Sequence, residues 1–102
     1  MAAKLEVLTA SDTGHDVLVH ITGTVGFSTV RELLKKIDFT ANAGQTIEID
    51  LAGVDHIDSA GIALFLEWLE RARRSNAQLR FVNSPKAMEQ LVAVNGVKNL
   101  IL

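Results

Sequence analysis

The sequence predicts an α/β fold: a single mixed, mostly parallel β-sheet with helices mainly on one face. Strand-like and helix-like segments alternate along most of the 102 residues, which is typical of parallel strands joined by crossover helices. The strands themselves alternate apolar with polar side chains, as at Ile47, Glu48 and Ile49. A parallel sheet with helices on both faces has strands that are apolar throughout, so the alternation indicates helices on one face.

The first third of the chain predicts a β-hairpin followed by a helix. Residues 5–9 and 16–22 show the two-residue periodicity of strands, with turn-forming residues between them. Apolar residues then recur at helical spacing over residues 30–37. Thr29 and Glu32 have the spacing of a capping box, which predicts the start of this helix.

The rest of the chain predicts two strand–helix units and a short final strand. A strand at residues 46–51 is followed by a loop and by a long helical pattern that opens at Ser59. A strand at residues 78–81 comes next, and a last helix has Pro85 at its first position. Residues 100–102 form the final strand, so the predicted order is β-β-α-β-α-β-α-β.

Length and composition bound the class of protein. We expect residues 1–102 to form one domain, because this length suffices for a single modest core. The net charge of −2 and the pI of about 5.8 give no indication of nucleic-acid binding. The chain has no cysteine, which excludes a disulfide framework and a thiolate metal site. No stretch resembles a signal peptide or a membrane span, so we expect a cytoplasmic protein without direct membrane insertion.

The sequence also lacks the motifs of an enzyme. His56, Asp58 and Ser59 lie close together, but Ile57 stands where the G-x-S-x-G nucleophile elbow requires glycine. Triad members this near in sequence would also require strained geometry. There is no phosphate-binding loop or dinucleotide fingerprint, and the histidines lack the spacing of metal ligands. We therefore expect no catalysis, no cofactor and no metal.

The turn that begins the long helix is the candidate functional site. Ser59 occupies the predicted N-cap position, where its hydroxyl accepts a hydrogen bond from a first-turn N–H group. Such a helix start either serves only as a cap or also suits an anion such as a phosphate. Ala60 and Gly61 are small and leave the turn open to a partner. Three carboxylates lie nearby in the sequence: Asp50, Asp55 and Asp58.

The long helix carries two apolar stripes. The stripe predicted to face the core consists of Ile62, Phe65, Leu66 and Leu69. Gly61, Leu64 and Trp68 fall to the side of it, so Leu64 and Trp68 are predicted to be at least partly exposed. Either another helix of the domain covers them, or they form a protein-binding patch continuous with Ser59. We favour the binding patch, because tryptophan is common among interface anchors.

Two neighbouring stretches resemble the signature of STAS domains, which occur in sulphate transporters and anti-sigma factor antagonists. They are residues 49–54 (IDLAGV) and residues 57–61 (IDSAG). The resemblance extends from about residue 5 to residue 102 and includes the turn at 23–25 and the ending at 95–97. It implies the STAS fold. In antagonists of this family a partner kinase phosphorylates the serine of the Asp-Ser motif, and Ser59 aligns with that serine.

Within the family the chain is more similar to the MlaB-like branch, on the basis of residues 27–30, 63–69 and 79–81. Antagonists more often carry serine at the position of Ala60. The resemblance implies a stand-alone, non-catalytic subunit that binds the ATPase of an ABC-type system moving phospholipid between bacterial membranes. Such a subunit would be cytoplasmic and peripheral at the inner membrane through its partner.

Two functions therefore remain open: the accessory subunit of a lipid transporter, and an anti-sigma factor antagonist whose partner kinase phosphorylates Ser59. An unregulated structural module is a third, less favoured alternative. The same surface is expected to bind the partner in both cases. Its predicted residues are Asp58, Ser59, Ala60, Gly61, Leu64 and Trp68.

Overall fold

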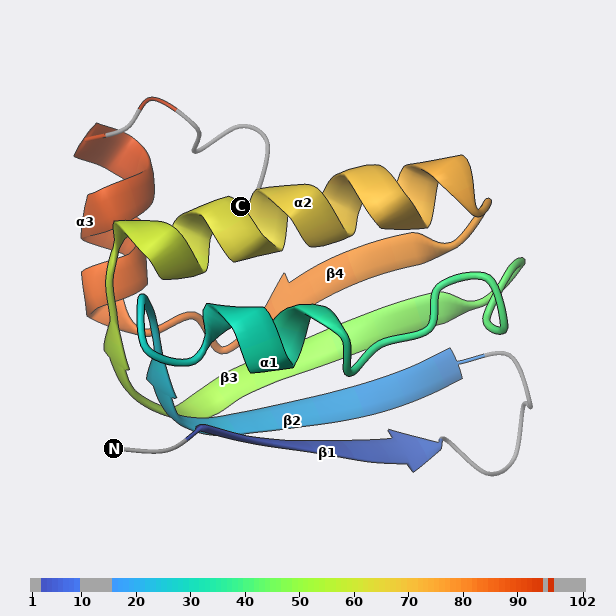
Figure 1. Ribbon diagram of the computed structural model, residues 1–102, viewed down its shortest axis with the longest axis horizontal. Coiled ribbons are helices and arrows are strands. Elements are labelled where there is room, and N and C mark those ends of the chain that lie inside the picture. The colour runs from blue at the N-terminus through green and yellow to red at the C-terminus, as the bar shows by residue number, and fades with distance from the viewer. Residues whose placement is uncertain (1–2, 10–15, 95, 97–102) are drawn as a thin grey trace.

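The strands and helices of the computed structural model follow the predicted order (Figure 1). The structure describes residues 3–9, 16–94 and 96. The elements are β1 (Ala3–Thr9), β2 (Asp16–Val25), α1 (Val30–Leu34), β3 (Thr46–Ile57), α2 (Ser59–Arg74), β4 (Gln78–Val82) and α3 (Lys86–Val94). The predicted final strand at residues 100–102 lies outside the described residues.

The four strands form one sheet in the order β1-β2-β3-β4. β1 and β2 are antiparallel, as the predicted hairpin requires, whereas the pairs β2–β3 and β3–β4 are parallel. The mixed, mostly parallel sheet is thereby confirmed. The carboxyl ends of β2 and β3 meet at one edge of the sheet, where the chain enters α1 and α2 (Figure 1).

The helices α1 and α2 lie on one face of the sheet, and α3 stands beside the start of α2 (Figure 1). The strand residues Ile47, Ile49 and Leu51 are fully buried against this helical layer, whereas Glu48 and Asp50 on the opposite face are half-buried. Apolar burial is the main stabilising force of such a layer. The predicted one-sided placement of the helices is confirmed.

The helix α1 begins at the predicted position but is shorter than predicted, and its first turn is capped differently. It ends at Leu34, and its Thr29 N-cap makes no side-chain capping bond, so the capping-box prediction is wrong. The Thr29 hydroxyl is buried instead in the preceding turn. It accepts from the Gly26 N–H at 3.1 Å and donates to the Thr24 carbonyl at 2.9 Å. The Thr29 hydroxyl is therefore used within the turn, and no bond from this side chain caps the start of α1.

Candidate functional site

The first turn of α2 is capped by Asp58, one residue before the predicted cap. Its Oδ1 accepts from the N–H groups of Ala60 at 2.9 Å and Gly61 at 3.2 Å, and its backbone is extended. Ser59 is the first residue of the helix and is exposed. The prediction that Ser59 is the N-cap is wrong, because the carboxylate at position 58 takes the first-turn N–H groups. Those groups are therefore already occupied by an anion, the Asp58 side chain.

The second oxygen of Asp58 fastens the turn before α1. Oδ2 accepts from the Phe27 N–H at 3.0 Å, which connects residues that are 31 positions apart in the sequence. Gly26 allows this approach, since a Cβ atom at that position would lie 2.4 Å from Asp58 Oδ2. One carboxylate thus holds the end of β2 and the start of α2 together.

The Asp58 carboxylate remains ionised at neutral pH. Burial on its own would raise the pKa of this group, but the hydrogen bonds from Phe27, Gly61 and Ala60 and the nearby His56 together lower its pKa below the ordinary value. Asp58 therefore acts as a fixed negative charge inside the turn. Any further negative charge at Ser59 would stand beside it.

Phe27 is the functional candidate that the sequence reasoning missed. Its side chain is 86% exposed, an unusual position for a large aromatic residue. The turn that carries it is fixed by the Asp58 bond and by the Thr29 hydroxyl. The available signal was an aromatic residue in a Gly-Phe-Ser turn directly after a strand, but its exposure depends on the bond to Asp58, which no local pattern reveals.

The predicted interface residues differ widely in access to solvent. Ser59 is exposed, Asp58 and Ala60 are half-buried, and Gly61 is buried. A Cβ atom at Gly61 would lie 2.5 Å from the Val25 carbonyl oxygen, so this glycine lets α2 approach β2. Only the outer part of the turn, centred on Ser59, is available to a partner.

The predicted exposure of Leu64 and Trp68 is wrong. Trp68 is 0% exposed and Leu64 is 5% exposed, and Trp68 stacks on Phe65 with ring centroids 5.8 Å apart. The buried face of α2 consists of Gly61, Ile62, Leu64, Phe65, Trp68 and Ala72. This face is centred on Phe65 and Trp68 and includes the small residues Gly61 and Ala72. Leu66 and Leu69, which were predicted to face the core, are only half-buried.

The nearby aspartates do not form one cluster around Ser59. Asp50 lies within β3, and an extended strand rises about 3.3 Å per residue, so eight positions separate it well from Asp58. Its carboxylate accepts from the Ala52 N–H at 2.9 Å and from Asn83 at 3.1 Å, and these bonds lower its pKa. Asp55 is exposed near the end of β3. Asp58 alone is bonded into the turn.

Within the described ranges, no group of three or more His, Asp or Glu residues could hold a metal ion. Among the described residues, no helix is long and apolar enough to span a membrane.

A protein-family model described as "Mlab, STAS domain" matches residues 8–102. The chain belongs to the STAS domain family. The anti-sigma-B factor antagonist of Bacillus subtilis (strain 168) is 24% identical over 87 residues, which cover 85% of this chain and 80% of that protein. The STAS resemblance of the sequence is therefore confirmed.

Solved structures agree on the fold. An anti-sigma factor antagonist from Mycobacterium paratuberculosis has a TM-score of 0.74 at 18% identity, over 96% of this chain and 83% of that chain. The Bacillus cell fate determinant SpoIIAA in its phosphorylated form has a TM-score of 0.71 at 16% identity, over 97% and 89%. The STAS fold predicted for this chain is confirmed by these similarities.

Proposed function

We propose that this STAS protein is a non-catalytic accessory subunit that binds and supports the ATPase of an ABC-type intermembrane phospholipid transporter, which maintains outer-membrane lipid asymmetry. The observation that carries the proposal is the match of residues 8–102 to the family model described as "Mlab, STAS domain". Residues 1–102 form one STAS domain in this proposal. The subunit acts in the cytoplasm and reaches the inner membrane through its partner.

The geometry of the α2 turn supports a protein-binding role. Ser59 is exposed at the first position of the helix, and the adjoining turn is held by Asp58. Phe27 stands exposed beside it. A fixed turn with an exposed aromatic residue loses little conformational freedom when a partner binds. The interface we propose is therefore centred on Ser59 and the outer surface of Asp58 and Ala60.

An anti-sigma factor antagonist is the second candidate, favoured by the 24% identity with the Bacillus subtilis antagonist. Its switch would be phosphorylation of Ser59 by an anti-sigma factor kinase. A phosphoserine carries about −1.5 to −2 charges at pH 7. Since Asp58 already holds the first-turn N–H groups, the helix start offers this added charge little compensation. Phosphorylation would weaken partner binding in this candidate.

Binding to purified candidate partners separates the two functions. The chain is mixed with the ATPase subunit of the phospholipid transporter from the same organism, and separately with the anti-sigma factor kinase and ATP. A stable complex with the ATPase subunit, without phosphate transfer to Ser59 by the kinase, supports the accessory role. Phosphate transfer to wild type but not to Ser59→Ala, together with no ATPase binding, supports the antagonist role instead.

A further inference from the structure

We propose that Phe27 and the hollow between α1 and α2 form a docking surface for an amphipathic helix of the partner protein. The apolar side of that helix fills the hollow, and its acidic side chains face α1. The inference rests on the proposed function, because it extends the Ser59 interface of the same partner. We call this surface the α1–α2 groove.

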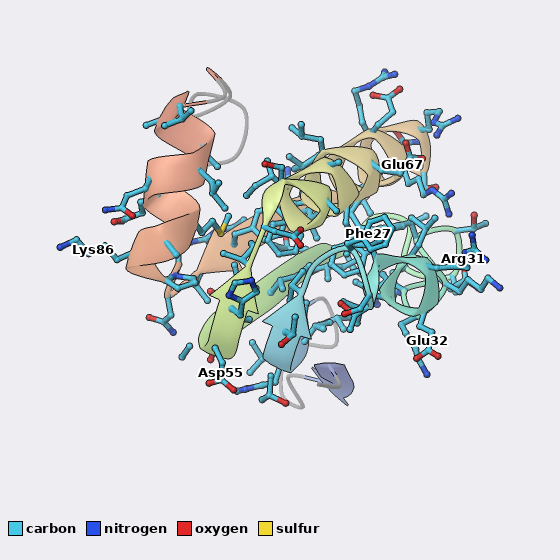
Figure 2. All side chains as sticks on the ribbon, turned by 60° about the vertical axis from the view of Figure 1, so that its left-hand side comes forward. Phe27, Arg31, Glu32, Asp55, Glu67 and Lys86 are labelled. Carbon is cyan, nitrogen blue, oxygen red and sulfur yellow. The ribbon has the colours of Figure 1, made fainter. Side chains whose placement is uncertain are left out.

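Phe27 supplies a fixed apolar anchor at one end of the groove. It is 86% exposed, and Val94, at 84%, is the other exposed large hydrophobic residue in the described part of the chain. The Phe27 N–H is bonded to Asp58, so the residue is held beside the start of α2. Figure 2 shows Phe27 between α1 and α2. Phenylalanine is among the aromatic residues that are enriched in protein interfaces.

The hollow itself lies between two helices and has an apolar floor. Its volume is about 390 Å³, and its lining consists of Val30, Arg31, Leu34, Ala60, Ala63, Leu64 and Glu67. Ala60 directly follows Ser59, so the hollow is continuous with the proposed interface. Leu64 is largely covered by the domain but still forms part of the floor. A groove between two helices is a common receptor for the apolar face of a third helix.

The charged residues beside the hollow indicate the charge of the partner helix. Arg31 on α1 lines the hollow and is exposed, and Lys35, the residue directly after α1, is exposed as well. Neither is in an ion pair within the described residues. Glu67 on the opposite rim is already bonded to Arg71 at 2.8 Å. Among the residues that line the hollow, the charge left available to a partner is therefore positive. Acidic side chains on the partner helix complement it.

A protein helix fits these observations better than two other occupants. A flat anionic membrane would meet the exposed Glu32 as well as Arg31, because both lie on the outer side of α1 in Figure 2, whereas a helix in the hollow meets the lining residues, which include Arg31 and not Glu32. A second copy of the chain would present the same positive rim to itself.

Matched apolar variants test the anchor and the hollow. The ATPase subunit, or the kinase if only the kinase binds wild type, is titrated against each variant by calorimetry. Phe27→Ala is expected to weaken binding by about 30-fold, the scale of a hot spot, whereas Val94→Ala leaves the affinity unchanged. Ala63→Trp fills the hollow from an exposed helix position and is also expected to weaken binding. Ala93→Trp, at an exposed position on α3, is its control.

Charge variants test the rim. Arg31→Glu with Lys35→Glu is expected to weaken binding and to reduce its dependence on salt, because the attraction to acidic side chains is lost. Lys86→Glu lies on the opposite side of the molecule in Figure 2 and is expected to leave the affinity unchanged. Melting curves on all variants check that each one is folded.

Five outcomes would overturn the inference. Folded Phe27→Ala and Ala63→Trp variants that bind like wild type exclude the groove. Charge variants that bind like wild type exclude the acidic helix. A wild-type dimer in light scattering that Phe27→Ala dissociates assigns the surface to a second copy, and flotation with phosphatidylglycerol vesicles that Phe27→Ala abolishes assigns it to a membrane. If wild type binds neither candidate partner, both the proposed function and the groove are excluded. If wild type binds a partner and the groove variants bind equally well, only the groove is excluded.

Discussion

The first turn of α2 and the middle of the same helix have opposite surroundings. At the first turn, Ser59 is exposed and Asp58 bridges to the neighbouring loop. Two turns later, Trp68 is fully buried and stacked on Phe65. The core therefore contacts the middle of the helix, whereas the first turn is open to a partner. A variant's effect should depend on which of these two regions it alters.

The largest expected effect belongs to the middle of the helix. Trp68→Ala should lower the free energy of unfolding by about 3–5 kcal/mol, the cost of removing a large buried aromatic residue. Chemical denaturation measures this loss. Trp68→Phe is the matched control and should cost less, because it keeps the ring against Phe65 and removes an indole Nε1 that is buried without a hydrogen-bond partner in the described part of the chain. A Trp68→Ala variant as stable as wild type would place this side chain outside the core.

A smaller loss is expected where the two regions meet. Gly61→Ala would place a Cβ atom 2.5 Å from the Val25 carbonyl oxygen, so it should destabilise the fold by about 1–3 kcal/mol. Ser59→Ala, two residues earlier on the exposed side, adds no atom at this contact and serves as the control. Alanine normally stabilises a helix relative to glycine. An increase in melting temperature for Gly61→Ala would therefore contradict the close approach of α2 to β2.

Two variants of Asp58 should separate its capping of α2 from its bond to the Phe27 N–H. Asp58→Ala removes both and should cost about 1 kcal/mol as a lost N-cap. Asp58→Asn keeps one oxygen for the N–H groups of Ala60 and Gly61 but turns an amide donor toward the Phe27 N–H. It should cost less stability while speeding hydrogen exchange at the Phe27 amide. Unchanged exchange at that amide in both variants would show that Asp58 does not hold the loop.

The smallest effect is expected in acid. Because the folded-state pKa of Asp58 is lowered, its carboxylate stabilises the fold above the unfolded pKa of about 3.9. This contribution is lost as the pH falls through the still lower pKa of the folded state. The difference in unfolding free energy between wild type and Asp58→Asn should therefore shrink below about pH 4. A difference that stays constant from pH 7 to pH 3 would exclude a role for the Asp58 charge.

The sequence was sufficient for the sheet but not for the rotation of α2. Alternation at Ile47, Ile49 and Leu51 determines which strand face is buried, because side chains on a strand have only two faces. A helix has many possible orientations, and the larger residues Leu66 and Leu69 favoured the wrong one. The observed orientation places Gly61 directly against Val25 of β2, and this contact between distant residues cannot be read from the helix pattern.

At the candidate site, too, the sequence did not determine which hydrogen bonds form. Asp58 and Ser59 are both good capping residues, so the pattern alone could not assign the cap to one of them. The choice follows from geometry, since Asp58 serves two helix N–H groups and the Phe27 N–H together. The exposure of Phe27 also depends on this contact between distant residues. Local sequence therefore indicated the turn that we propose as the site, but it did not indicate the exposed Phe27 beside it.

The affinity of Ser59→Asp for the partner tests the central claim most directly, that the first turn of α2 is the binding region. Ser59→Asn is the control, because it has nearly the same shape without the charge. Both variants should melt close to wild type, since Ser59 is exposed and makes no capping bond. Titration calorimetry should show that the aspartate variant binds at least about tenfold more weakly than the asparagine variant, the effect of about 1.4 kcal/mol of charge burial. Equal affinities of the two variants for the partner would place the turn outside the interface and contradict the account.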